Sequence, residues 1–202
     1  MKKTVSYAKG LYTALRLEAL LRPSCERIEI AGSIRRRWPT VGDIELVAIP
    51  RKRYQASLLG DVEAEKTYLD LHLERYPEFY KVVANGDRMK RILFDGMQVD
   101  LFVTDPARWG VIMTLRTGSK DFATWLVTSR DQGGARRVDR IVKDGRVWEI
   151  GQTEPLETPE EPYVFQALGV PWTPLEMRHK GYWHSDMDTW QPVREVMRAN
   201  HE

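Results

Sequence analysis

Two carboxylates and a run of arginines lie close together in the first quarter of the chain, and their types suit phosphate chemistry. An apolar segment, 28–31, ends in Gly32 and Ser33 and is followed shortly by three consecutive arginines. A second apolar segment then begins with Asp43 and Glu45. Alternate residues of a strand point to the same face, so these carboxylates would share one face. Neighbouring carboxylates repel one another unless a cation neutralises them. Magnesium ligands beside phosphate-binding donors indicate phosphoryl or nucleotidyl transfer.

Taken alone, each part of this pattern is weak. An Asp-x-Glu pair on a strand is usually a solvated face, and a single Gly-Ser turn says less still. The order of the parts favours chemistry: strand, Gly-Ser, arginines, Gly42 with the two carboxylates, and strand. This order resembles the core of the nucleotidyltransferase superfamily, in which a helix N-terminus after Gly-Ser holds the triphosphate and carboxylates hold two metal ions.

A third carboxylate, Asp100, stands among apolar residues in the segment 97–103, which predicts a strand. By itself it would be an edge-strand residue facing water. Beside a strand with two carboxylates it becomes the expected third ligand, because a two-metal site needs more oxygen ligands than two side chains supply. The expected cofactors are therefore two Mg²⁺ or Mn²⁺ ions held by Asp43, Glu45 and Asp100.

The composition is that of a globular chain of 202 residues, enough for one compact domain or two small ones. The formal net charge of +2 does not by itself indicate a nucleic-acid-binding protein. Basic residues form several clusters, each of which alone is more typical of a solvated surface. The single cysteine, Cys25, indicates a reducing compartment, and no apolar run is long enough to span a bilayer. The sequence shows no signal peptide.

Periodicity and turn residues predict an alternation of helices and strands. Asn85-Gly86 and Asp95-Gly96 are typical hairpin turns, and Ser119 is a typical helix N-cap. We expect helices over 5–21, 54–76, 106–115, from Ser119 to about 130, and 163–168, strands over 28–31, 43–49, 79–83, 89–94, 97–103, 138–142 and 146–150, and a loop over 153–162.

With these residues in place, the chain resembles the X family of DNA polymerases, typified by polymerase beta. The matching stretches follow the family's order and lie at 32–36, 42–45, 99–100, 117–119 with Phe122, and 164–170 before Pro174. The Thr-Gly-Ser and Phe-Gln-Ala-Leu-Gly stretches belong to the family's thumb. The resemblance implies an α+β fold, with a nucleotidyltransferase palm sheet and flanking helices in residues 1–116 and a small thumb-like subdomain in residues 117–202.

The resemblance also implies roles for individual residues. Asp43, Glu45 and Asp100 would form the metal triad, and Asp100 would accept the proton of a primer 3′-hydroxyl. The expected nucleotide-binding residues are Gly32, Ser33, Arg36, Gly42, Arg116, Thr117, Gly118, Ser119 and Lys120. The expected DNA-binding residues are Arg35, Arg37, Arg88, Lys90, Arg91, Arg136 and Arg137.

The chain departs from the family's pattern at informative positions. Glu45 stands where polymerase beta has aspartate, and Gln98 replaces a basic residue beside the third acid. Leu115 and Arg116 replace an aromatic pair that helps to exclude ribonucleotides, so we expect weaker exclusion here. Only one helix precedes the palm, which leaves no room for the lyase domain or the helix-hairpin-helix clamps of larger relatives.

The function expected from the resemblance is a minimal DNA-directed DNA polymerase for gap-filling repair. Its expected partners are primer–template or gapped DNA and nucleoside triphosphates, with no membrane. We expect a monomer in the cytoplasm, bacterial or encoded by a virus or phage. Two alternatives remain: a nucleotidyltransferase acting on an RNA end, a protein or a small molecule, and a non-catalytic nucleic-acid-binding relative.

Overall fold

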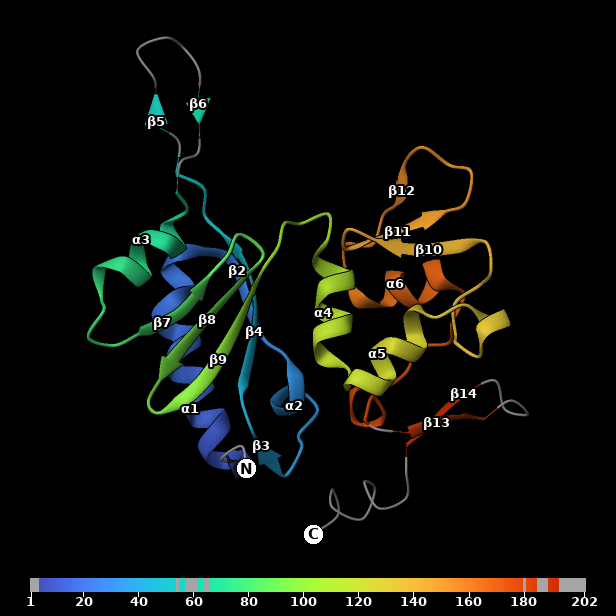
Figure 1. Cartoon of the computed structure of the whole chain (residues 1–202), viewed down its shortest axis with the longest axis horizontal. Coiled ribbons are helices and arrows are strands. Elements are labelled where there is room, and N and C mark those ends of the chain that lie inside the picture. Colours follow the sequence, from blue (N-terminus) through green and yellow to red (C-terminus); the bar gives the residue numbers. More distant parts are fainter. Residues whose placement is uncertain are drawn as a thin grey trace.

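The computed structural model describes residues 4–53, 55–56, 62–63, 66–179, 181–184 and 189–192. Two lobes lie side by side, the N-terminal one built on a five-stranded sheet and the C-terminal one on short helices and small sheets (Figure 1). The first sheet has five strands in the order β2-β4-β9-β8-β7, and only β4 and β9 are parallel among them. These strands are β2 (Cys25–Ile30), β4 (Ile44–Pro50), β7 (Lys81–Asn85), β8 (Met89–Phe94) and β9 (Met97–Val103).

Local sequence explains the hairpin at the centre of this sheet. Asp95 and Gly96 have φ values of 48° and 73°, and they join β8 to β9 with Phe94 opposite Met97. A two-residue turn with both φ values positive matches the twist of paired strands, which is why Asp-Gly is favoured there. The hairpin predicted from this dipeptide is confirmed.

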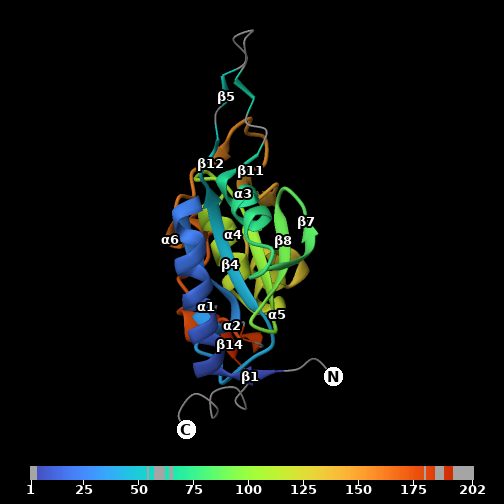
Figure 2. The ribbon, with the colours of Figure 1, turned by 90° about the vertical axis from the view of Figure 1, so that its left-hand side faces the viewer.

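Apolar side chains cover both faces of the sheet. On one face, Ile44 and Leu46 belong to a cluster that includes Leu17 of α1 (Tyr7–Leu21) and Leu69 of α3 (Tyr68–Arg75). Figures 1 and 2 show α1 lying along the sheet. On the other face, Val47 and further sheet residues pack against α4 (Trp109–Thr117). Burial on both faces explains why β4 is an almost continuous apolar run.

The C-terminal lobe has a core of its own. It is built from α5 (Lys120–Val127), α6 (Glu161–Leu168) and the small sheet β10-β11-β12 (Arg140–Lys143, Arg146–Glu149 and Pro155–Leu156). Ser119 caps α5 by accepting a hydrogen bond from the backbone N–H of Phe122 at 3.2 Å, as predicted. Phe122 lies in the buried cluster of this lobe, so the cap also fixes a core residue.

Short elements complete the fold. The strands are β1 (Val5–Ser6), β3 (Thr40–Val41), β5 (Gln55–Ala56), β6 (Val62–Glu63), β13 (Gly181–His184) and β14 (Thr189–Pro192). The short helices are α2 (Gly32–Arg35) and three 3₁₀ turns at Arg22–Ser24, Arg130–Gln132 and Leu175–Met177. Within the described residues, no helix combines the length and the apolar character needed to cross a membrane.

The predicted helix over 54–76 is wrong in its first half. Gln55–Ala56 pairs with Val62–Glu63, and helix α3 begins only at Tyr68. Thr67 and Asp70 form a capping box, which starts a helix at that point instead of continuing one. The remaining residues of 54–65 lie outside the described part of the chain.

Other boundaries differ by a few residues. Helix α4 runs three residues later at its start than predicted and two later at its end, and α6 begins at Glu161 instead of 163. Helix α5 ends at Val127, before the predicted 130. Strand β7 is Lys81–Asn85 instead of 79–83, and β12 lies within the predicted loop. The mixed α+β class with helices flanking the sheet is confirmed.

The apolar clusters can be compared with the expected boundary between the two subdomains at residue 116. Apolar cluster members of the first lobe extend to Val103, and those of the second lobe begin at Val111. Trp109 and Met113, from the same helix as Val111, join a third cluster with the sheet. Helix α4 therefore packs on both lobes, and the division into 1–116 and 117–202 stays a prediction.

Candidate active site

The sheet register brings the three predicted carboxylates to one place. Glu45 on β4 lies directly opposite Asp100 on the parallel strand β9. Asp43 precedes Glu45 by two residues, immediately before β4 begins. Residues opposite each other in register share a face, so the carboxylates of two chain segments more than fifty residues apart lie together.

The electrostatics of Glu45 reflect this gathering. Burial and the nearby Asp43 raise its pKa to about 7, Arg36 and Arg116 oppose the rise, and Asp100 adds to it. A carboxyl group with such a pKa is one that a neighbouring cation would keep ionised. The environment therefore fits a cation by charge.

Asp100 is held by an arginine that the sequence analysis had assigned to DNA. Arg91, its register partner on β8, donates from Nε to Oδ1 at 2.7 Å and from Nη2 to Oδ2 at 2.8 Å. Gln98 adds a hydrogen bond to Oδ1 at 3.2 Å. Both oxygens of Asp100 are thus engaged by protein donors. No group of three or more His, Cys, Asp or Glu side chains in the described part of the chain is arranged to hold a metal ion.

The donor set still fits a divalent cation in type, since carboxylate oxygens are its preferred ligands. For Asp100 to bind one, its two oxygens would have to exchange the guanidinium of Arg91 for the ion. The metal site therefore stays a prediction, with Asp43, Glu45 and Asp100 as its candidate ligands.

Gly32 allows the backbone to approach these carboxylates closely. Its φ is +62°, and a Cβ at this position would overlap the carboxylate of Glu45. The backbone N–H of Ala31, the residue before α2, donates a hydrogen bond to the carbonyl oxygen of Glu45 at 2.8 Å. This bond joins the start of α2 to β4. Ser33 lies in α2, so the Gly-Ser turn adjoins the carboxylates as predicted from the motif.

Two arginines from this region reach across to the C-terminal lobe. Arg35 donates to Thr117 Oγ1 at 2.8 Å and pairs with Glu161 at 2.6 Å. Arg36 donates to the carbonyl oxygen of Thr117 and, at 3.2 Å, to Nδ1 of His179. Burial lowers the pKa of Arg36, the nearby Glu45 opposes this, and Arg178 adds to it. The predicted phosphate and sugar-side residues, Arg36 and Thr117, are therefore brought together.

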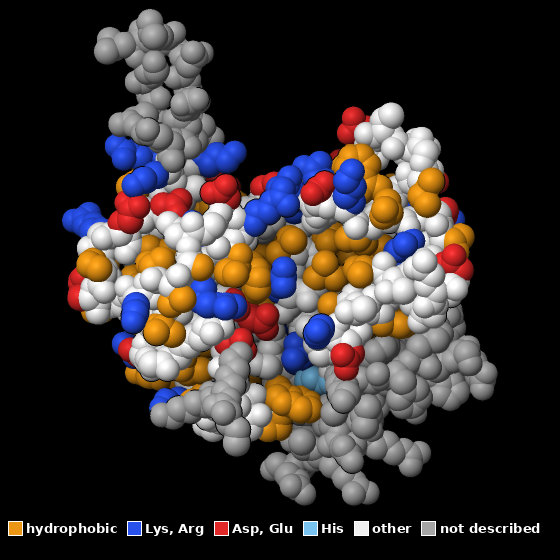
Figure 3. Space-filling model, in the orientation of Figure 1, with side chains coloured by type: hydrophobic (Ala, Val, Ile, Leu, Met, Phe, Trp, Pro, Cys, Tyr) orange, Lys and Arg blue, Asp and Glu red, His pale blue; other side chains and the backbone are white. Residues whose placement is uncertain are grey.

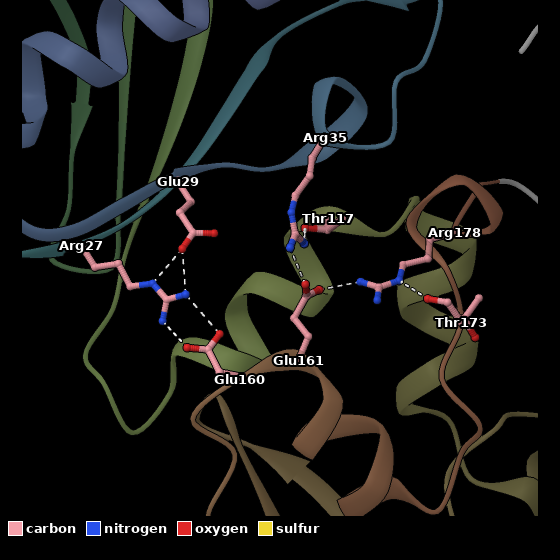
Figure 4. A network of polar contacts seen from close by, with 8 residues as sticks. All are labelled: Arg27, Glu29, Arg35, Thr117, Glu160, Glu161, Thr173 and Arg178. Carbon is pink, nitrogen blue, oxygen red and sulfur yellow. Dashed lines mark hydrogen bonds and ion pairs between the residues drawn. The ribbon is translucent and has the colours of Figure 1, made fainter.

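Glu161 also binds Arg178, and this pair was not singled out from the sequence. Figure 4 shows Glu161 between Arg35 and Arg178, with the pair Arg27–Glu160 beside it. Arg178 is fully buried and donates to Glu161 at 2.5 Å. The partners are far apart in the chain, so no local spacing marks them.

The remaining predicted nucleotide-side residues adjoin Thr117. Gly118 ends α4, and a Cβ there would meet the ring of Phe122 at 2.6 Å. Ser119 caps α5, and Lys120 is exposed at its first turn. Gly42 is half-buried directly before Asp43. Arg116 lies over the ring of Phe102, 4.0 Å from its centroid.

Among the expected DNA-binding residues, Arg35 and Arg91 are paired with Glu161 and Asp100, as described above. Arg37 and Arg88 are exposed, and Arg137 is exposed but paired with Asp139 at 2.6 Å. Arg136 donates to backbone oxygens of Val127 and Arg140, which gives it a structural use.

Lys90 requires a correction. It lies on the sheet face under α3, only 4% exposed, and pairs with Asp70 at 2.5 Å. The period of two along β8 places Lys90 and Arg91 on opposite faces. Lys90 therefore stabilises the sheet–helix contact and is not placed to bind a DNA phosphate.

Comparison with known proteins shows a likeness of fold. No protein-family profile and no curated protein sequence matches the chain. Among solved structures, it is similar to Leishmania infantum polymerase beta in a ternary P/T complex, with 16% identity over 87% of this chain and 77% of the other, and a TM-score of 0.65. A ternary gap complex of the same enzyme gives 15% identity, 87% and 71% coverage and a TM-score of 0.66. The fold is thus polymerase-beta-like.

Proposed function

We propose that this protein is a nucleotidyltransferase of the DNA polymerase type, extending a primer 3′-hydroxyl with nucleoside triphosphates. The observation that carries the proposal is the placement of Glu45 opposite Asp100, with Asp43 adjacent, beside the Gly-Ser turn and Arg36. The polymerase-beta-like fold supports it. Gap-filling repair, action as a monomer and a cytoplasmic location belong to the same proposal.

In this proposal the residues divide the work. Asp43, Glu45 and Asp100 hold the divalent ions, which when bound supply Lewis acidity and neutralise phosphate charge. Asp100 accepts the proton of the 3′-hydroxyl as its oxygen attacks the α-phosphorus and pyrophosphate leaves. Ser33 and Arg36 bind the β- and γ-phosphates. Arg91 would have to release the Asp100 carboxylate before that group could serve in either role.

Primer extension tests this directly. A labelled primer on a gapped template, with all four deoxynucleotides and magnesium or manganese, should be extended by the wild type and not by Asp43→Asn or Asp100→Asn. The same reactions with an RNA end, a protein or a small-molecule acceptor identify another acceptor if DNA is not extended. Lack of transfer to every acceptor, from a folded protein, would refute the enzymatic proposal.

The bidentate pair of Arg91 with Asp100 favours a second candidate, a non-catalytic nucleic-acid-binding relative. In such a protein the arginine would permanently neutralise the carboxylate. This candidate predicts DNA binding without transfer, and binding that is the same with and without magnesium. Extension by the wild type would exclude it.

A further inference from the structure

A partly open cavity of about 190 Å³ lies where the two lobes meet, at the carboxyl end of β9. Arg88, Arg108 and Arg116 line it, and Phe102 and Ile112 give it apolar surface. Figure 3 shows Lys and Arg side chains gathered where the lobes meet. The cavity thus offers cationic and apolar surface together, as a sugar-phosphate unit requires.

The positive charge of the cavity is only weakly neutralised. Asp144 is the one acidic residue in its lining, and it lies 3.8 Å from Arg88, with both side chains more than half exposed. Arg108 is 3.5 Å from Asp105. Exposed pairs at such distances contribute little stability, so an incoming anion can replace the carboxylates.

Two polar atoms of the lining residues lack partners. Among the described residues, Thr104 Oγ1 and Arg108 Nε are buried without a hydrogen bond. Buried polar atoms in folded proteins are nearly always satisfied, so each exception needs an explanation. Both atoms are closed off from solvent, so each side chain would have to turn toward the cavity before it could donate to a phosphate oxygen there.

We propose that this cavity binds an internal phosphate of a nucleic-acid strand, with the sugar against Phe102 and Ile112. Its volume is below the roughly 300–1,000 Å³ of typical small-molecule sites, which suits one sugar-phosphate unit whose neighbours lie outside. Thr104 follows Asp100 by four residues, about 13 Å along an extended strand at roughly 3.3 Å per residue.

This inference rests on the proposed function in one respect, namely that the bound strand is DNA. The cavity would hold the strand a few nucleotides from the proposed reaction site. A phosphate that replaced Asp144 at Arg88 would exchange that ion pair between the lobes for a contact with the strand, and the Arg35–Glu161 contact would still join the lobes.

Equilibrium binding of a short fluorescent DNA strand, without magnesium or nucleotide, tests the inference independently of catalysis. Arg108→Ala should weaken binding about tenfold or more, because a charge-assisted hydrogen bond is lost. The slope of log affinity against log salt should fall in magnitude by about 0.7. Thr104→Val, which keeps the shape, should weaken binding about two- to tenfold and leave the slope unchanged.

The matched control is Arg75→Ala, an exposed arginine in the last turn of α3, on the opposite face of the sheet. It should bind as the wild type does, and unfolding curves should show that all variants are folded. The proposal is overturned if Arg108→Ala and Thr104→Val both bind like Arg75→Ala.

Free phosphate groups provide the second arm of the test. A nucleoside monophosphate that binds the wild type as tightly as the strand, and loses affinity equally in Arg108→Ala, would assign the cavity to free nucleotides and overturn the strand assignment. Weak competition by the monophosphate supports it. If primer extension fails while these binding results hold, the proposed enzymatic activity is refuted and the proposed phosphate site in the cavity is not.

Discussion

At the scale of single residues, the meeting of Gly32 with Glu45 is the tightest constraint on the candidate active site. Alanine at φ +62° costs about 1–2 kcal/mol, and the overlap of its Cβ with the Glu45 carboxylate adds roughly 1–3 kcal/mol. Gly133→Ala is the matched control, since its φ is +81° and no atom lies within 4 Å of the added Cβ. Urea unfolding should show a clearly larger loss for Gly32→Ala; equal losses would mean that Glu45 moves away freely.

Arg116 is the residue expected to affect sugar choice. Its guanidinium stacks on Phe102, and it stands where the resemblance to X-family polymerases would place an aromatic residue. A pocket discriminates poorly against a small added hydroxyl unless a rigid group excludes it. Arg116→Phe should therefore raise the preference for deoxynucleotides over ribonucleotides, by roughly tenfold or more. Single-nucleotide insertion with matched substrates measures it, and an unchanged ratio in the variant would remove Arg116 from sugar selection.

At the scale of elements, the contact between α2 and the start of α6 depends on one buried carboxylate. Burial would raise the pKa of Glu161, but the hydrogen bond and charge of Arg35 and the charge of Arg178 lower it overall. Glu161→Gln leaves the buried Arg178 without its counter-charge, and such a loss costs about 3–5 kcal/mol. The neighbouring Glu160→Gln breaks only a half-exposed pair with Arg27, worth up to about 1 kcal/mol. Thermal unfolding of the two variants compares them; equal effects would contradict the buried network.

The same contact should include one acid-sensitive contribution to stability, that of His179. Burial and the neighbouring Arg36 lower the pKa of His179 from 6.5 to about 4. The unfolded chain therefore binds more protons between these values, so stability is complete above about pH 6.5 and is lost as the pH falls toward 4. At about 1.4 kcal/mol per pKa unit, the loss is on the order of 3 kcal/mol. Glu45, whose pKa is raised to about 7, acts in the opposite sense over the same range, so the test compares His179→Gln with the wild type. Urea unfolding should show that the change in stability from pH 7 to pH 5 is more favourable in His179→Gln than in the wild type, and an identical change in both proteins would refute this.

At the scale of the whole molecule, ligand binding should stabilise a fold that carries unsatisfied charge. Glu45 has two carboxylate neighbours, so ions that bind only the folded protein should raise its melting temperature. Magnesium with nucleotide at a hundred times the dissociation constant contributes about 2.7 kcal/mol, or roughly 5–10 °C. Removal of the metal with a chelator should reverse the rise. The variant Asp100→Asn should show less of it, and a full rise in that variant would argue against a metal at Asp100.

Patterns of nearby residues determined much of this protein. The spacing of Asp43 and Glu45, the Asp95-Gly96 turn and the Ser119 cap each depend on residues a few positions apart or on strand period. Local geometry of this kind is written in the sequence, because period and turn chemistry act over short distances. The α+β fold was expected from the resemblance to the X family of DNA polymerases that the motifs carry in their order.

Only the tertiary structure decided which charges meet. Arg91 faces Asp100 because the β8–β9 register aligns them, while its neighbour Lys90 faces the opposite side and is buried with Asp70. Glu161 joins Arg35 and Arg178 across two lobes. The sequence does not distinguish a solvated charged residue from a paired one, because the partner is fixed by packing between segments distant in the chain. Only the structure therefore distinguishes the basic residues that are exposed from those that are paired within the protein.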